Sequence, residues 1–151
     1  MEIVVDSSVL VGMLVPNDVW HERTVELWAV IEANGHQAIV LDCVVAEAIS
    51  VAVRRLREKG FVAKVQSLLD GLDTYVPYDM ITWILADTRR LYSQILGLVR
   101  SSSGELNFHD ALIALACRER NIPAIASFDA DFDQVPWLQR IARPEDIPPS
   151  A

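Results

Sequence analysis

IVVDSSVLVGML, residues 3–14, begins with a short apolar run that stops at Asp6. Three branched apolar residues in a row predict a buried strand over 3–5, because strands covered on both faces are continuously apolar rather than alternating. The small and apolar residues after it predict a short helix over 7–15. Pro16 stops that helix, because proline cannot continue it. The stretch therefore predicts a strand and a helix with an aspartate at their junction.

The same alternation continues along the chain. Further strands are predicted over 38–41, 74–77 and 124–127, with an edge strand over 138–142. The predicted helices cover 19–33, 42–59, 61–69, 79–100 and 108–121. Short apolar strands that alternate with helices are typical of a three-layer α/β/α sandwich with a central, mainly parallel sheet. That is the fold class we expect.

The length and composition predict one globular domain over 1–151. Hydrophobic residues make up 52% of the 151 residues, far above the disordered range. The elements place the core within 2–143 and leave an irregular tail over 144–151. The net charge of −8 argues against a loose electrostatic grip on nucleic acid, but it permits a metal site or a basic protein partner.

The chain offers no disulfide framework and no zinc motif. Cys43 and Cys117 both fall in apolar helical patterns, so we expect buried, reduced thiols. The first residues lack the basic and long apolar regions of a secretory signal, and no apolar run approaches a membrane span. A cytoplasmic protein without membrane contact is the expectation.

Acidic residues gather where the predicted strands end. Asp6 follows the first strand directly, and Asp129 follows the strand over 124–127. Glu47 lies one turn into the helix after the second strand, and Asp110 lies in the first turn of the helix over 108–121. In parallel sheets, sites form at the carboxyl ends of the strands. Asp110 is the hardest to place at that edge by topology alone.

Each carboxylate also has an ordinary structural interpretation. Asp6 can cap the helix after it, Glu47 can pair with an arginine, and Asp129 can belong to a turn. Asn107 and Asp110 have the spacing of a reciprocal helix cap. Several carboxylates at one edge, however, cannot all ionise cheaply without a cation. A site of oxygen ligands without histidine or thiol suits Mg²⁺ or Mn²⁺.

Four segments together resemble the PIN-domain family, especially the VapC ribonuclease toxins of toxin–antitoxin modules. They are VVDSSVL at 4–10, VVAEAIS at 44–50, NFHDALIALAC at 107–117 and IASFDADF at 125–132, in the family's order. Each is a weak pattern alone, whereas four in order over 4–132 are specific.

The resemblance implies a metal-dependent endoribonuclease that hydrolyses RNA. Its acidic quartet would fall on Asp6, Glu47, Asp110 and Asp129, which would hold one or two Mg²⁺ or Mn²⁺ ions. The auxiliary polar residues of the site would be Ser8, Asn107 and Asp131. The resemblance also implies a homodimer and a cognate antitoxin that blocks the pocket with a basic segment.

Other features leave alternatives open. Arg54 and Arg55 belong to a basic run that is either a solvated face or a track for RNA phosphates. His109 neighbours Asp110 but is assigned no chemistry. The rival functions are a catalytically silent PIN module that binds RNA or protein, and a PIN nuclease in RNA maturation. A phosphoacceptor receiver domain would need a lysine near a strand end, and Lys59 and Lys64 both lie in predicted helices.

Overall fold

A sheet of five parallel strands forms the centre of the computed structural model, which describes residues 1–149. The strands are β1 (Glu2–Val5), β2 (Gln37–Leu41), β3 (Ile81–Thr82), β4 (Ala124–Ala126) and β5 (Gln139–Ile141). Their order across the sheet is β3-β2-β1-β4-β5. The predicted α/β fold with a mainly parallel sheet is confirmed. The strand order reverses between β1 and β4, and such a switch point is where open parallel sheets place their sites.

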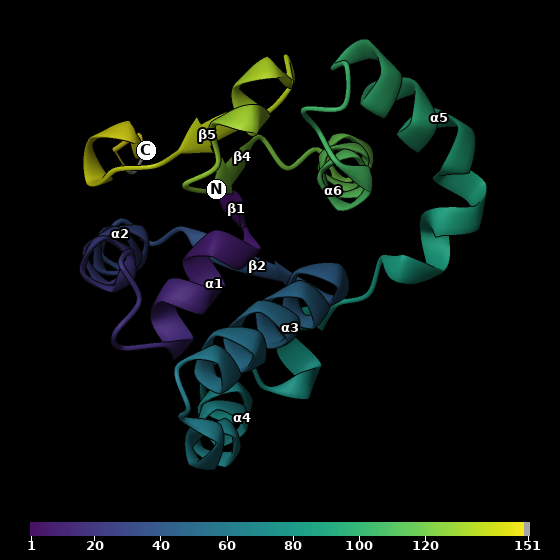
Figure 1. Cartoon of the computed structure of the whole chain (residues 1–151). Coiled ribbons are helices and arrows are strands. Elements are labelled where there is room, and N and C mark those ends of the chain that lie inside the picture. The colour runs from purple at the N-terminus through teal and green to yellow at the C-terminus, as the bar shows by residue number, and fades with distance from the viewer. Residues whose placement is uncertain (150–151) are drawn as a thin grey trace.

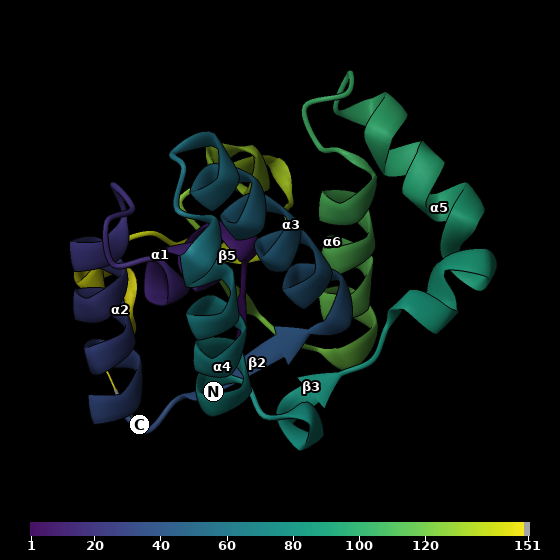
Figure 2. The same ribbon diagram turned by 60° about the horizontal axis from the view of Figure 1, so that its bottom comes forward.

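Helices cover the sheet on both sides. They are α1 (Ser7–Leu14), α2 (His21–Ala33), α3 (Asp42–Glu58), α4 (Val65–Tyr75), α5 (Thr88–Ser101) and α6 (Phe108–Arg120). In both ribbon views α5 and α6 lie together on one flank, away from α1 and α2 (Figures 1 and 2). Helix α3 leaves the carboxyl end of β2 and packs along α1.

The core follows directly from the apolar runs in the sequence. Residues 3–5 of β1 are fully buried, as expected for a central strand covered on both faces. Residues 111–117 of α6 are all buried. This helix is apolar all round because α5 packs against it on the side away from the sheet.

The structure corrects the sequence prediction between residues 60 and 88. Helix α4 runs to Tyr75 and contains Gly71, which does not end it, because Leu68 and Leu72 anchor the helix in the core. The strand expected over 74–77 is therefore absent, and the real strand is β3.

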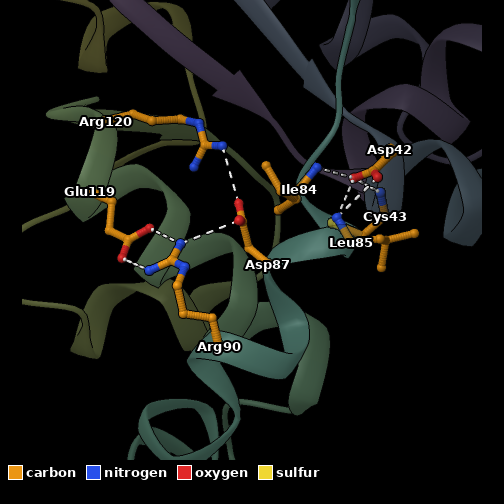
Figure 3. Close-up of polar contacts among 8 residues, drawn as sticks. All are labelled: Asp42, Cys43, Ile84, Leu85, Asp87, Arg90, Glu119 and Arg120. Atoms are coloured by element: carbon orange, nitrogen blue, oxygen red, sulfur yellow. Dashed lines mark hydrogen bonds and ion pairs between the residues drawn. The ribbon is translucent and has the colours of Figure 1, made fainter.

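The helix expected over 79–100 begins only at Thr88. Two contacts hold the chain extended before it. Strand β3 pairs with Val40 and Leu41 of β2. The Asp42 carboxylate then accepts hydrogen bonds from the backbone nitrogens of Ile84 and Leu85, each at 3.0 Å (Figure 3). Long-range pairing thus overrides the local helical pattern.

Smaller boundary differences have local causes. Helix α2 starts at His21, because Asp18 accepts a hydrogen bond from the backbone nitrogen of Trp20 in the preceding loop. Within the predicted irregular tail, Pro144–Asp146 forms a 3-10 turn and Ile147 is buried, while the last two residues of that prediction lie outside the described residues. Cys43 and Cys117 are buried free thiols, as predicted. Among residues 1–149, no helix has the length and apolar character needed to span a membrane.

Candidate active site

Asp6 lies at the centre of the carboxyl edge of the sheet. Its backbone nitrogen donates to the carbonyl of Ala126 at 2.9 Å, which extends the β1–β4 ladder by one residue. Its side chain caps α1, and its Oδ2 accepts hydrogen bonds from the hydroxyls of Ser8 and Ser127, each at 2.7 Å. Asp6 is 5% exposed, and among residues 1–149 its carboxylate is held by neutral hydroxyls and backbone without an ion pair.

Ser127 is a site residue that the sequence analysis did not single out. It is fully buried, directly after β4, and its hydroxyl oxygen also accepts the backbone N–H of Asp129 at 3.0 Å. Ser8 plays a matching part, because its hydroxyl accepts the backbone N–H of Phe128 at 3.1 Å. The two serines therefore fasten the chain after β4 to the start of α1. The signal in the sequence was a lone polar residue at the end of an apolar strand.

Asp110 occupies the first turn of α6 in the predicted reciprocal cap. Its backbone nitrogen donates to the Asn107 side chain at 3.0 Å, and its Oδ2 accepts the Asn107 backbone N–H at 2.9 Å. The carboxyl group is 6% exposed. Within residues 1–149 its other oxygen accepts no hydrogen bond, so the cap occupies only one side of the carboxylate.

The four predicted carboxylates act on one another electrostatically. Burial, and then the charges of Asp6, Asp129 and Glu47, raise the pKa of Asp110 from 3.8 to about 6, against one opposing hydrogen bond from the Asn107 backbone. Burial and the charges of Asp6 and Asp129 also raise the pKa of Glu47, which is half-buried on α3. Asp110 and Glu47 therefore lie within electrostatic reach of each other and of Asp6 and Asp129, near the carboxyl edge of the sheet.

The turn after β4 carries the neighbouring aspartates Asp129 and Asp131. Asp129 is exposed, and its Oδ1 accepts the backbone N–H of Asp131 at 2.9 Å. The charge of Asp129, and not that of Asp131, contributes to the raised pKa of both Asp110 and Glu47. This favours Asp129 as the fourth member of the quartet.

Two residues near the pocket deserve a revised interpretation. His109, to which the sequence analysis gave no chemistry, lies within electrostatic reach of Glu47 and lowers the pKa of that carboxyl. Ser7 donates a side-chain hydrogen bond that acts on Glu47 in the same direction. The hydroxyls of Ser7 and Ser8 thus support different carboxylates of the same pocket.

Comparison with known proteins agrees with this arrangement. The sequence profile of the PIN domain matches residues 3–138. The chain belongs to the PIN domain family. A solved PIN-fold structure that it resembles is VapC20 from Mycobacterium tuberculosis, described as a sarcin–ricin loop cleaving toxin, with a TM-score of 0.68 and 21% sequence identity. The match covers 89% of this chain and 95% of VapC20. No curated protein sequence matches significantly.

The PIN fold accounts for the one position that topology left uncertain. The predicted resemblance to this family is confirmed, and the start of α6 does face the carboxyl edge that carries Asp6. Asp110 lies in the first turn of α6, whereas Asp6 directly follows β1 and Asp129 lies in the turn after β4.

The donor set of this PIN domain fits a hard divalent cation. Its candidates are carboxylate oxygens, supported by serine hydroxyls, and no lysine or arginine within residues 1–149 forms an ion pair with Asp6, Glu47, Asp110 or Asp129. Across the same residues, no three His, Cys, Asp or Glu side chains converge as a preformed metal cage. Mg²⁺ usually keeps several waters and binds through one or two carboxylates, so a loose carboxylate pocket suits it.

The two predicted RNA-contacting arginines have different surroundings. Arg54 is exposed on α3. Arg55 instead forms an ion pair with Asp18, whose side chain is only 3% exposed. Arg55 is therefore fixed in place next to α1, whereas Arg54 is free to reach into solvent.

Proposed function

We propose that this PIN domain is a metal-dependent endoribonuclease that hydrolyses RNA phosphodiester bonds. One observation carries the proposal: the charges of Asp6 and Asp129 raise the pKa of both Asp110 and Glu47 at the switch point of the sheet, and within residues 1–149 none of the four carboxylates forms an ion pair with lysine or arginine. Ionising such groups together is costly, and a bound divalent cation would lower that cost.

One or two Mg²⁺ or Mn²⁺ ions would be held by Asp6, Glu47, Asp110 and Asp129. The metal would supply the Lewis acidity that activates a water molecule and neutralises the charge of the phosphate. The chain's own groups set the geometry of the pocket. Ser8 and Ser127 fix the rotation of the Asp6 carboxylate through hydrogen bonds of 2.7 Å. Asn107 fixes Asp110 through the reciprocal cap, and leaves one of its oxygens available to the pocket.

We further propose that the protein is the toxin of a toxin–antitoxin pair. The confirmed family and the fold shared with the VapC20 toxin support this role. The net charge of −8 suits a cognate antitoxin that covers the pocket with a basic segment. A group of carboxylates without basic partners attracts both a metal cation and a basic inhibitor, because both carry positive charge.

A homodimer is the proposed assembly. Large apolar side chains are exposed between residues 75 and 92, namely Tyr75, Tyr78, Met80, Trp83, Leu85 and Tyr92. A group of this kind supports a protein–protein contact. Light scattering coupled to size-exclusion chromatography gives the mass of the assembly directly. Trp83→Asp should shift a dimer to the monomer mass of 16.9 kDa.

The experiment that tests the nuclease proposal is cleavage of total RNA by the pure protein with Mn²⁺, with new 5′ ends mapped by sequencing. We expect cuts at a few sites, carrying 5′-phosphates, that disappear with a chelator and in Asp110→Asn. Asp87→Asn is the matched control, because Asp87 lies outside the pocket in an ion-pair network.

A different pattern would overturn the proposal. Equal cleavage by wild type and Asp110→Asn would show that the activity does not come from this pocket. Cleavage that survives the chelator would rule out a metal-dependent mechanism. No cleavage, together with calorimetric binding of RNA, would instead identify a catalytically silent binding module.

A further inference from the structure

A hollow of about 150 Å³ lies next to the carboxylate pocket and has no part in the hydrolysis described above. Its lining residues come from α1, α3 and the loop before α2, and they are Ser7, Ser8, Val11, Trp20, Val51 and Arg55. The Ser8 hydroxyl donates a hydrogen bond to Asp6 at 2.7 Å. The hollow therefore shares Ser8 with the groups that position the carboxylates.

One wall of the hollow is a braced aromatic ring. Trp20 stacks on Phe128, with the ring centroids 4.9 Å apart and the planes at 20°. The guanidinium of Arg23 lies 4.9 Å from the centroid of Trp20 and 5.1 Å from that of Phe128. The backbone nitrogen of Trp20 is tied to Asp18 at 3.0 Å. A ring fixed in this way gives a ligand a large contact area at little cost in conformational entropy.

The opposite wall carries a fixed guanidinium. The Nη1 of Arg55 is bound by the buried Oδ2 of Asp18, while the Arg55 side chain keeps 41% exposure. A guanidinium has five N–H donors and no acceptor, so one ion-paired nitrogen leaves donors available at the hollow. Asp18 thus positions Arg55 and the backbone of Trp20 together.

These walls select a flat, aromatic ligand with hydrogen-bond acceptors on its edge. Trp20 offers a stacking surface, Val11 and Val51 offer an apolar floor, and Arg55 offers donors in a fixed plane. Proteins bind unstacked RNA bases on aromatic side chains in this way, and an arginine recognises the O6 and N7 acceptors of guanine in preference to adenine, which presents a donor at that edge.

A second hollow of about 300 Å³ extends the first. It shares Trp20 and Arg55 with it and continues past Asn17 to Lys59. A strand of RNA with its base between Trp20 and Arg55 would therefore meet a further positive charge on the side away from the carboxylates. This continuation fits a polymer better than a small free ligand.

We propose that the hollow between Trp20 and Arg55 is a base subsite, which receives the base of a nucleotide next to the scissile phosphate and favours guanine. This inference rests on the proposed nuclease function, because it assumes that RNA lies across the pocket. It makes Trp20 and Arg55 specificity-determining residues, and it makes Asp18 a positioning residue that acts through them.

The experiment uses an RNA with a randomised segment, cleaved by the full-length protein with Mn²⁺ and sequenced at the cut ends. We expect guanine to be enriched at one position beside the cut by wild type. Arg55→Gln should reduce that enrichment about tenfold, the size of one lost bidentate contact. Arg55→Lys should not restore it, because lysine lacks the planar fork.

Two further variants separate base recognition from other effects. Arg54→Gln removes an exposed charge one residue away, and it should weaken cleavage of all sequences equally and leave the guanine enrichment intact. Trp20→Phe keeps an aromatic wall and should retain the preference, whereas Trp20→Leu should lose it. Thermal unfolding of each variant shows whether the fold survives, and the Arg55 variants test the subsite even if Trp20→Leu does not fold.

The outcomes distinguish the two proposals. If wild type cleaves with Mn²⁺ but Arg55→Gln has the same base preference, the base subsite is wrong and the nuclease function stands. If Arg54→Gln alters the preference as much as Arg55→Gln, the effect is general charge and the subsite is again wrong. If wild type does not cleave RNA at all, the nuclease function fails and takes the subsite with it.

Discussion

Two acidic regions of this protein contrast sharply in how their charges are satisfied. At the join between α3, β3 and α5, every acidic side chain has partners (Figure 3). Asp42 accepts backbone N–H groups of Cys43, Ile84 and Leu85. Asp87 and Glu119 pair with arginines of α5 and α6, Arg90 and Arg120. At the carboxyl edge of the sheet, the four carboxylates Asp6, Glu47, Asp110 and Asp129 have only serine hydroxyls and backbone groups as hydrogen-bond partners among residues 1–149, and they lie near one another's negative charges.

The difference separates carboxylates that hold the fold together from those proposed to form the active site. Asp42 and Asp110 allow a direct comparison, because each is 6% exposed. The two carboxylates differ in how many hydrogen-bond donors offset their negative charge. Asp42 receives three backbone donors, whereas Asp110 receives one and faces three negative neighbours, so its pKa rises to about 6. Under the proposed function, a divalent cation would supply the compensation that the fold itself does not give Asp110.

Removing the satisfied carboxylate should have the largest effect on stability. Asp42→Ala would leave the buried backbone nitrogens of Ile84 and Leu85 without their acceptor, at a cost of about 4 kcal/mol in the free energy of unfolding. Urea unfolding measures this. Asp42→Asn keeps one acceptor oxygen and should lose roughly half as much. Equal losses in both variants would show that the charge, rather than the bonds, matters.

Loosening the unsatisfied region should affect activity more than stability. Ser127→Ala removes a hydroxyl that holds Asp6 at 2.7 Å and also accepts the N–H of Asp129. We expect kcat/KM for RNA to fall by about ten- to a hundredfold, the usual loss when a group that orients a metal ligand is removed. Ser127→Thr keeps the hydroxyl and serves as the control. Full activity in Ser127→Ala would show that Asp6 needs no such support.

The pH dependence of stability should follow the uncompensated carboxylate. The pKa of Asp110 is higher in the folded protein, at about 6, than its ordinary value of 3.8, so its contribution to stability is complete below 3.8 and is lost as the pH rises through 6. Without divalent cations, the free energy of unfolding should be higher at pH 5 than at pH 7.5, by about 1.5 kcal/mol from this group.

The matched measurement for this prediction is Asp110→Asn, which should lack that part of the pH dependence. Mn²⁺ at pH 7.5 should stabilise the wild type, because it binds the folded state alone, and should stabilise the variant less. An identical pH profile in the two proteins would mean that Asp110 titrates normally.

The smallest effect should come from the exposed ion pairs of the satisfied region. Arg90 bonds both oxygens of Glu119, at 2.7 and 2.8 Å, but its side chain is 56% exposed. Surface pairs of this kind contribute little, because water and salt screen them. Arg90→Ala should therefore shift the urea midpoint less than Asp42→Asn does, and added salt should remove the difference. A larger shift would identify the network as a true brace between α5 and α6.

The sequence predicted those parts of the molecule that local patterns determine. The apolar run of β1 and the all-round apolar character of α6 follow from burial on both sides, and the strand ends then place Asp6 and Asp129 at one edge. The prediction failed where a residue far away in the sequence determines the local backbone conformation. Asp42 holds Ile84 and Leu85 in an extended connection that no local pattern reveals, and β3 is too short to recognise.

The same limit applies within the site. Ser127 is visible as a polar residue after an apolar strand, but only the fold shows that its hydroxyl meets Asp6. Arg55 is part of a basic run in the sequence, and its distinction from Arg54 depends on Asp18, which lies 37 residues earlier. The residue types were readable, whereas their pairing required the tertiary structure.

The bond from Ser127 to Asp6 joins residues 121 positions apart, and this separation has a consequence for how the protein is made. On the ribosome, the first strand emerges long before the fourth, so a growing chain cannot assemble the pocket until about the last fifth of its length has left the exit tunnel. A chain truncated after residue 120 should accordingly be inert towards RNA. Under the proposed nuclease function, topology alone thus keeps an unfinished chain inactive until β4 has paired with β1.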